Sequence, residues 1–239
     1  MISSSVGDGI AKAAGGWTFG TGVPQSFDDH ITKSVPAYNL MHSLVLELSD
    51  FFVRRDSVVY DVGSSTGSLT KQIAQRVHPR APNAKVIGID PEIEMVRFAR
   101  NHSAHEAVTY LAEDVLDVEL EPSDLVVLCL TAQFLHPDDR ATLLKKIWSA
   151  LKWSGALIMF EKTRASDARF HDIFTALYSD FKEEMGFSPH EIVAKQKSLR
   201  AVMEPFSDRG NRELLQAAGF SDIEVVFRII PFTGFLAIK

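Results

Sequence analysis

The stretch from Ser57 to Gly67 constrains the fold of this chain more than any other part of the sequence. Val58–Val62 is a short run rich in β-branched and aromatic residues, which is typical of a buried strand. Gly63 and Gly67 then bracket a turn of small residues, and Ser68–Arg76 returns to a helical period. A strand, a glycine turn and a helix in this order bring the backbone of an α/β sheet close to a nucleotide-like ligand.

The residues of this turn indicate which ligand it would bind. The glycines do not follow the pattern Gly-x-Gly-x-x-Gly, and no lysine follows them as in a phosphate-binding loop. Asp61, at the end of the predicted strand, places a carboxylate beside the turn, where it would repel a pyrophosphate and suit a cationic amino-acid group. This favours S-adenosylmethionine as the ligand. An ordinary strand, turn and helix without a ligand is the competing interpretation.

Further strands and helices alternate along the chain, which predicts a doubly wound α/β fold. We expect a mostly parallel, seven-stranded, Rossmann-like methyltransferase sheet that ends in an antiparallel C-terminal strand. The predicted strands after the first are 85–90, 108–111, 125–130, 156–160, 223–230 and 232–238. Two helices interrupt the alternation as an insertion at about 166–205, the second of them reaching about Met203. Residues 17–239 form one predicted domain, and residues 1–16, small and polar, form a predicted mobile segment.

The overall composition excludes several function classes. A net charge of −6 and a pI near 5.7 argue against a broad phosphate-binding surface, which disfavours a nucleic-acid partner but leaves room for a local basic patch. A single cysteine, Cys129, excludes an internal disulfide and fits a reducing compartment. The sequence shows neither a secretion signal nor an apolar segment long enough to span a bilayer. We therefore expect a cytoplasmic protein without a membrane partner.

Acidic residues at the ends of the second and third predicted strands extend the ligand site. Asp90 can accept both hydroxyl groups of a ribose, although an acid just before Pro91 can also cap a helix. Asp114 can accept the amino group of adenine while Val115 donates its backbone N–H group. A surface acid beside Asp117 is the competing interpretation of Asp114. The acids at the three strand ends together are far more specific than any one of them.

Motifs along nearly the whole chain support a more specific assignment. The chain resembles the class I S-adenosylmethionine methyltransferases and, among them, the bacterial carboxy-S-adenosylmethionine synthases of tRNA wobble-uridine modification. The resemblance begins at Trp17 and includes the helical insertion. The matching pieces are Trp17-Thr-Phe19, Lys33-Ser-Val-Pro-Ala-Tyr38, Tyr60-Asp-Val-Gly-Ser64, Ile89-Asp90, Thr131-Ala-Gln-Phe-Leu135, Glu161-Lys162, Asp180-Phe-Lys182 and Gly219-Phe220.

The resemblance implies an enzyme that converts S-adenosylmethionine and prephenate to carboxy-S-adenosylmethionine. It also implies roles for individual residues. Tyr38 would approach the methionine end of the cofactor, and Asp90 would bind the ribose. The residues that would line the cofactor or hold its adenine are Gly63, Ser64, Ser65, Asp114 and Val115.

Two positions depart from the family. Where the family has an asparagine that contacts the methionine part, this chain has Cys129, and where it has an arginine that grips the extra carboxylate, this chain has Gln196. A neutral amide cannot form the bidentate, charge-assisted pair that an arginine forms. Arg200 lies one turn later on the same predicted helix face, and Lys195 and Lys197 flank the site, so these cations offer partial compensation. An inconsequential exchange at Gln196 is the competing interpretation.

From these departures we expect ordinary methyl transfer to a small-molecule acceptor, with an acidic 2-oxo acid as the candidate. Carboxy-S-adenosylmethionine synthesis from prephenate is the alternative, and a non-catalytic S-adenosylmethionine-binding protein is the second alternative. Glu161 and His136 follow predicted strands and are the candidate bases, although His136 can instead cap the helix that it precedes. We expect no metal in the site. The apolar stripe of the insertion, which includes Phe170, Ile173 and Leu177, would cover the site or form a homodimer face.

Overall fold

The computed structural model describes residues 23–239, so the predicted mobile segment 1–16 and the Trp17-Thr-Phe19 motif lie outside the described residues. Seven strands form one sheet in the order β3-β2-β1-β4-β5-β7-β6. The first five are parallel, and β7 runs antiparallel to both β5 and β6, which confirms the predicted sheet. The strands are β1 (Val58–Val62), β2 (Lys85–Ile89), β3 (Val108–Leu111), β4 (Ser123–Cys129), β5 (Leu151–Lys162), β6 (Asp222–Ile229) and β7 (Phe232–Ile238).

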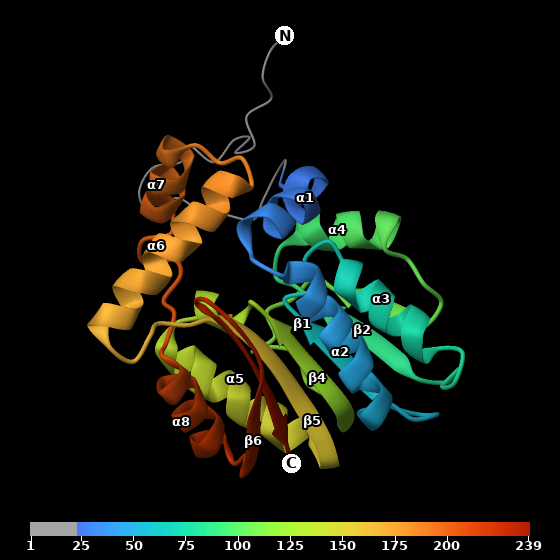
Figure 1. Cartoon of the computed structure of the whole chain (residues 1–239). Helices are drawn as coiled ribbons and strands as arrows, with labels where there is room; N and C mark the ends of the chain where they lie inside the picture. Colours follow the sequence, from blue (N-terminus) through green and yellow to red (C-terminus); the bar gives the residue numbers. More distant parts are fainter. Residues whose placement is uncertain (1–22) are drawn as a thin grey trace.

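Helices cover both faces of this sheet (Figure 1). The chain forms helices α1 (Pro24–Ser34), α2 (Tyr38–Phe52), α3 (Ser68–Val77), α4 (Ile93–His102), α5 (Pro137–Ala150), α6 (Ala168–Glu184), α7 (Pro189–Ser198) and α8 (Asp208–Ala218). One core lies between the sheet and α2 and α3, where Met41 and Ile73 are fully buried. The other lies between the sheet and α5 and α8, where Leu143 and Leu215 are fully buried. The central strands β1 and β4 are therefore covered on both sides, as their apolar sequences require.

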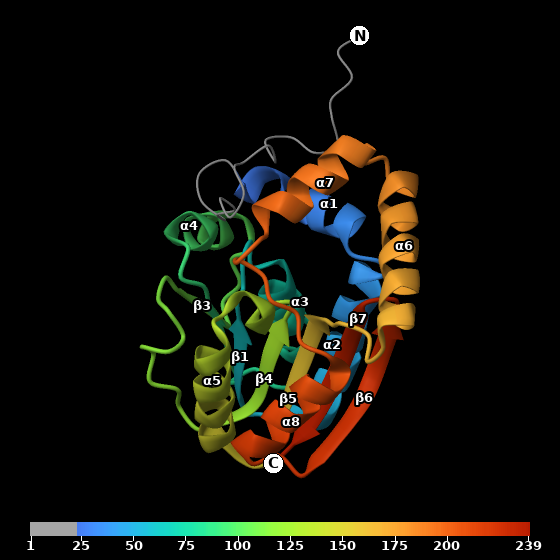
Figure 2. The same cartoon turned by 90° about the vertical axis from the view of Figure 1, so that its left-hand side faces the viewer.

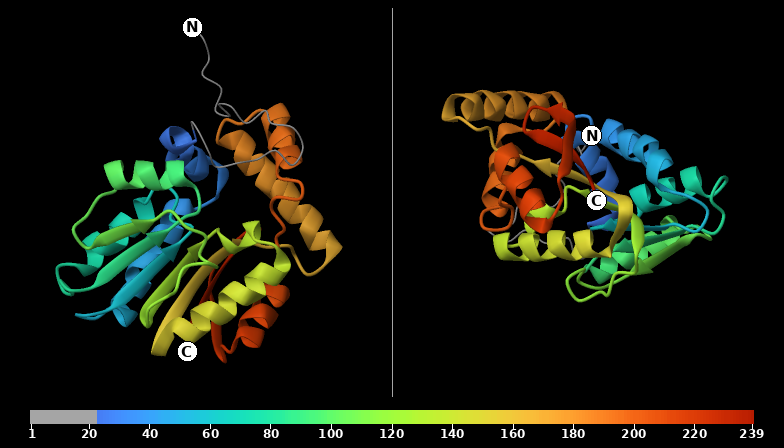
Figure 3. Two further views of the ribbon diagram at one scale, coloured as in Figure 1. Left: turned by 180° about the vertical axis from the view of Figure 1, so that it is seen from behind. Right: turned by 90° about the horizontal axis from the view of Figure 1, so that it is seen from below.

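The insertion consists of α6 and α7, which stand beyond the carboxyl ends of the strands together with α1 (Figures 2 and 3). A capping box starts α7, because the Ser188 side chain accepts from the Glu191 N–H group and the Glu191 carboxylate accepts from the Ser188 N–H group. The sequence predicted that this helix extends to about Met203, but it ends at Ser198. The stripe of α6 faces solvent, with Phe170, Ile173 and Leu177 exposed by 54%, 45% and 47%. Tyr178 of the same predicted stripe lines the pocket described below, so the stripe covers the site only through part of its length.

Gly67 is the position where the turn after β1 depends most on glycine. Its φ of 73° lies in the left-handed region, and an added Cβ would overlap the hydroxyl of Tyr110. That hydroxyl donates to the carbonyls of Gly67 (3.2 Å) and Ser103 (2.9 Å), so it holds the turn against β3.

We expect Gly67→Ala to destabilise the fold by about 2–5 kcal/mol, since left-handed backbone costs about 1–2 kcal/mol and overpacking about 1–3 kcal/mol. Urea unfolding measures this change. Gly210→Ala is the matched control, because a Cβ there meets its nearest atom at 3.4 Å inside helix α8. The control should be neutral or slightly more stable than the wild type. Equal unfolding midpoints for the two variants would refute this account of the turn.

Candidate functional site

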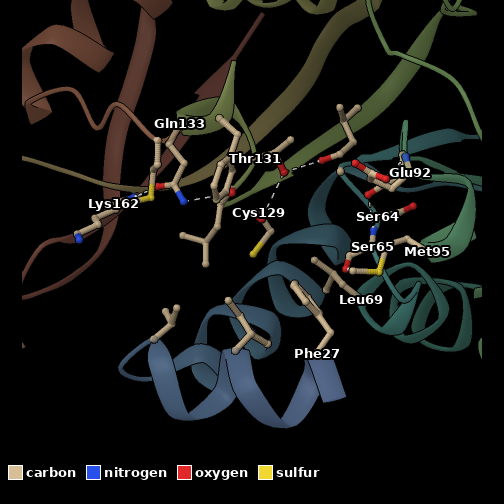
Figure 4. Close-up of a pocket in the computed structure, with 18 of the residues that line it drawn as sticks. Phe27, Ser64, Ser65, Leu69, Glu92, Met95, Cys129, Thr131, Gln133 and Lys162 are labelled. Atoms are coloured by element: carbon tan, nitrogen blue, oxygen red, sulfur yellow. Dashed lines mark hydrogen bonds between the residues drawn. The ribbon is translucent and has the colours of Figure 1, made fainter. Parts of the chain in front are cut away.

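A cavity of about 530 Å³ lies at the carboxyl ends of β1, β2, β4 and β5. Its walls come from the turn after β1, from α1 and the start of α2, and from the insertion. Figure 4 shows Ser64, Ser65 and Glu92 on one side of this pocket, Cys129 and Thr131 in the middle, and Gln133 and Lys162 on the other side. The carboxyl edge of a parallel sheet is where α/β folds bind ligands. The pocket is long enough to have two ends with different chemistry.

The glycine turn brings bare backbone to the pocket. The N–H groups of Gly63 and Ser64 donate to the Ile89 carbonyl at 2.7 and 3.1 Å, which fixes the turn against β2. Gly63 has a φ of 77°, and a Cβ there would overlap the side chain of Thr131. Thr131 in turn donates from Oγ1 to the Val62 carbonyl at 2.9 Å. The turn thus has one arrangement, with Gly63, Ser64 and Ser65 all lining the cavity as expected.

Asp90 joins the turn to the second strand. Its Oδ2 accepts from the Ser65 N–H group and its Oδ1 from the Glu92 N–H group, both at 2.9 Å. The side chain is 7% exposed and lines the cavity, and burial raises its pKa. A carboxylate has about four lone-pair positions, so each oxygen keeps one for a ligand hydroxyl. Asp90 therefore both organises the turn and offers two acceptors to the pocket.

Asp61 and Tyr38 face the pocket from β1 and α2. The Asp61 Oδ2 atom accepts from Thr70 Oγ1 at 2.6 Å, and burial raises the pKa of the carboxyl to about 6. Burial likewise raises the pKa of the Tyr38 hydroxyl, whose ring contacts His42 at 4.3 Å between centroids. A cationic ligand group would return the Asp61 carboxyl to its charged form, because opposite charges favour ionisation.

Asp114 and Val115 line the cavity after β3. Asp114 is exposed, and its Oδ1 accepts from the Leu116 N–H group at 2.9 Å, while Val115 is buried. At the position expected for adenine, the exposed carboxylate of Asp114 thus lies next to the buried, apolar side chain of Val115.

The residues present fit S-adenosylmethionine. Ser64 Oγ is buried at the turn without a hydrogen-bond partner among the described residues, which leaves a polar atom for a ligand to satisfy. Asp90 keeps its free lone pairs close by, and the glycine turn leaves room for the ligand backbone. The combination of an orphaned hydroxyl, free acceptors and a buried acid matches the hydroxyl and ammonium groups of this cofactor.

Cys129 ends β4 at the wall of the pocket. Burial, with smaller contributions from the charges of Asp61 and Glu161, raises the pKa of its thiol. A thiol with a raised pKa forms little thiolate and reacts slowly.

We therefore expect Cys129→Ser to keep its turnover and the native, ligand-free thiol to react slowly with iodoacetamide. Labelling rates compared with those of the urea-unfolded protein measure this. Fast labelling of the native protein, with complete loss of turnover in the serine variant, would show that Cys129 is a nucleophile.

The structure gives Glu161 a role other than the base that we expected. Glu161 is 2% exposed and is not among the residues that line the pocket. Its two carboxylate oxygens accept from the N–H groups of Ala132 and Gln133 at 2.9 and 2.8 Å. Burial raises its pKa to about 8. Glu161 thus stabilises the turn after β4 through these hydrogen bonds. Its contacts favour a structural role over the role of a base that we expected.

His136 does line the pocket, but it also caps α5. Its Nδ1 accepts from the Asp138 N–H group at 3.4 Å, and 69% of the side chain is exposed. A side chain that is mostly exposed and engaged in a helix cap is poorly placed to act as a base on a ligand inside the pocket. The capping alternative is therefore the one that its contacts favour.

Gln196 lines the pocket from α7, whereas Arg200 does not. Because α7 ends at Ser198, Arg200 lies beyond the helix and is exposed, and Leu199 and Met203 line the wall in its place. The expectation that Arg200 compensates for Gln196 is thus corrected, since the predicted helix is too long. Of the two flanking lysines, Lys195 does line the pocket and Lys197 does not.

Lys162, Tyr178 and Lys182 line the far end of the pocket, although no sequence pattern predicted a role for them there. Lys162 follows Glu161 at a strand end, and Tyr178 and Lys182 stand four residues apart on α6. Two signals in the sequence could have indicated them: the position of Lys162 at the end of a strand, and the spacing of four residues that places Tyr178 and Lys182 on one face of a helix.

The comparisons with known proteins agree with this geometry. Residues 59–155 match the model of the methyltransferase domain. The carboxy-S-adenosyl-L-methionine synthase of Staphylococcus epidermidis is 35% identical over 224 residues, which cover 93% of this chain and 97% of that protein. The synthase of Actinobacillus succinogenes is 35% identical over 243 residues and the full length of both.

The chain belongs to the carboxy-S-adenosyl-L-methionine synthase family. It is therefore a class I S-adenosylmethionine-dependent transferase, and its methyltransferase domain implies the use of S-adenosylmethionine. Solved structures share the fold. An O-methyltransferase family protein from Burkholderia thailandensis has a TM-score of 0.65 at 19% identity, covering 91% of this chain and 59% of that one. The methyltransferase SibL has a TM-score of 0.60 at 20% identity, covering 84% and 55%. Among residues 23–239, no helix is long and apolar enough to cross a membrane.

Proposed function

We propose that this protein makes carboxy-S-adenosylmethionine from S-adenosylmethionine and prephenate. The observation that carries the proposal is the extent of the similarity to the named synthases, which covers 93% of the chain and not only the methyltransferase domain at 59–155. The matched length includes α6 and α7, whose residues wall the end of the pocket beyond the cofactor turn. Similarity over both halves of the pocket favours a shared reaction over a shared cofactor alone.

The chemistry of the pocket supports a second substrate of this kind. When bound, S-adenosylmethionine supplies an activated one-carbon group on its sulfonium. The carboxyl group lost from the prephenate ring replaces a hydrogen of that methyl group, and the aromatised remainder leaves as phenylpyruvate with water. The protein's part is to hold the two molecules together and to exclude bulk water. The apolar side chains suited to this are Phe134, Leu199, Met203 and Phe232.

Methyl transfer to a small acidic acceptor, such as a 2-oxo acid, is the second candidate. Gln196 favours it, since this residue lines the pocket at the position where the resemblance implies an arginine, and Arg200 lies outside the lining. A neutral amide gives a weaker grip on the carboxylated product than a guanidinium does. The same pocket would then bind the acid as a methyl acceptor.

We expect Gln196→Arg to raise the affinity for carboxy-S-adenosylmethionine about tenfold or more, through one charge-assisted pair in a partly dry site. The affinity for S-adenosylmethionine, which lacks that carboxylate, should stay level or fall. Competition binding of the two ligands to the wild type and the variant measures both. Arg200→Ala is the control and should change neither affinity, because this side chain is exposed outside the pocket. Tight wild-type binding of the carboxylated ligand that is lost in Arg200→Ala would contradict the role given to position 196.

The mass of the nucleoside that copurifies with the protein tests the proposed function. Denaturation of freshly purified protein and mass spectrometry of the released ligand suffice. Carboxy-S-adenosylmethionine supports synthase activity. S-adenosylhomocysteine or S-adenosylmethionine without a carboxylated species supports the second candidate.

A further inference from the structure

Two lysine side chains, Lys162 from the end of β5 and Lys182 from α6, meet at the far end of the pocket. Their Nζ atoms lie 4.7 and 4.2 Å from the centroid of the same Tyr178 ring, and the charge of Lys182 acts on Lys162. Lys182 is 9% exposed and Lys162 is half-buried. Two cations held close together and away from water repel each other and lose hydration, which is costly without a counter-ion.

No carboxylate of the described residues forms an ion pair with either lysine. Glu161, next to Lys162 in sequence, turns its carboxylate to the N–H groups of Ala132 and Gln133 instead. The acids near Lys182 on α6, Asp180 and Glu183, are exposed. Burial lowers the pKa of both lysines to about 8, and the charge of Lys182 contributes to the shift at Lys162. The pair thus has no carboxylate partner among the described residues, and an anionic ligand in the pocket would supply one.

The surroundings hold this pair in place. The Tyr178 hydroxyl donates to the Ser34 carbonyl at 2.8 Å, and its ring packs edge-on against Phe232 at 5.5 Å. The backbone N–H group of Lys162 donates to Gln133 Oε1 at 2.8 Å. Because α1, β5, β7 and α6 all fix the arrangement, the ammonium groups are oriented before a ligand arrives.

From this geometry we infer that Lys162 and Lys182 form a carboxylate-binding subsite that recognises the second substrate, an organic acid with an apolar body. The inference rests on the proposed function for the position of the cofactor, at the Ser64 and Asp90 side of the same pocket. One carboxylate between the two ammonium groups neutralises their repulsion and restores both to their charged form. Phe232 and Tyr178 border the subsite and suit an apolar ring or chain.

Calorimetry with sodium prephenate and sodium phenylpyruvate tests the subsite. The protein is first saturated with S-adenosylhomocysteine, which carries no transferable group, so that binding is read without turnover. Lys162→Met and Lys182→Met should each weaken binding of the acids about tenfold or more, since each removes a charge-assisted contact. Lys162→Arg and Lys182→Arg should retain most of the affinity, because they keep the charge. Affinity for S-adenosylhomocysteine should stay within about twofold in all four variants.

Lys145→Met is the matched control, because Lys145 is an exposed lysine on α5 and its loss changes the net charge equally. Unchanged acid affinity in folded Lys162→Met and Lys182→Met would overturn the inference, as would a wild type that binds neither acid. A loss confined to S-adenosylhomocysteine would also overturn it, since the lysines would then hold the cofactor. The proposed function fails separately, through the identity of the product. Lysine-dependent acid binding with a methylated product would leave the subsite standing.

Discussion

Asp90→Ala is expected to weaken S-adenosylmethionine binding by about 100-fold or more. The substitution removes two hydrogen bonds from ribose hydroxyls to a charged acceptor, together worth roughly 3 kcal/mol or more. It also releases the Ser65 N–H group that Asp90 Oδ2 holds at 2.9 Å, which loosens the turn that borders the ligand. Titration calorimetry with S-adenosylmethionine measures the loss.

The control for this prediction is Asp117→Ala, which removes an exposed acid near the same edge of the sheet. Its affinity should equal that of the wild type. Urea unfolding of Asp90→Ala establishes that the variant is folded, since Pro91 still favours the start of the following helix. Wild-type affinity in a folded Asp90→Ala protein would remove the ribose assignment.

Glu161→Ala is expected to destabilise the fold by about 3 kcal/mol or more, because it leaves two buried N–H groups without acceptors. Those groups belong to Ala132 and Gln133 in the turn after β4. Chemical denaturation measures the change. A variant with wild-type stability and no turnover would instead restore Glu161 as a catalytic base.

The pH dependence of stability offers a second measurement on Glu161. Its pKa is raised from 4.5 to about 8, so the folded state binds a proton more tightly than the unfolded state does. The corresponding stability is fully present below pH 4.5 and is lost as the pH rises through 8. The wild type should therefore lose stability between about pH 4.5 and pH 8, and Glu161→Gln should lose less. Parallel curves for the two proteins would contradict the raised pKa.

The sequence predicted the sheet and the cofactor side of the pocket because local patterns determine them. The buried run Val58–Val62, the glycine turn after it and the acid at Asp90 each lie within a few residues of one strand end. The carboxyl ends of parallel strands lie at one edge of the sheet, so the order of the strands alone predicts that these residues, far apart in sequence, lie close together. Five of the residues predicted to bind the cofactor line the cavity: Gly63, Ser64, Ser65, Asp90 and Val115. Their roles toward the cofactor stay predictions.

The rest of the site depends on contacts that the sequence does not reveal. Glu161 stands at a strand end, like Asp90, but its carboxylate turns to two backbone N–H groups, and only the path of the turn decides this. Arg200 was misplaced because α7 ends at Ser198, two residues before it. Lys162 and Lys182 both border the Tyr178 ring because α6 packs against Phe232 of β7 and Ser34 of α1. Contacts between distant parts of the chain fix the positions of these two lysines.

The product formed from S-adenosylmethionine and prephenate tests the central claim most directly. Purified protein is incubated with both compounds, and the nucleoside and the acid are then identified by mass spectrometry. The account predicts a nucleoside that is heavier than S-adenosylmethionine by one carboxyl group, formed together with phenylpyruvate. S-adenosylhomocysteine together with a methylated acid, and no carboxylated nucleoside, would contradict it.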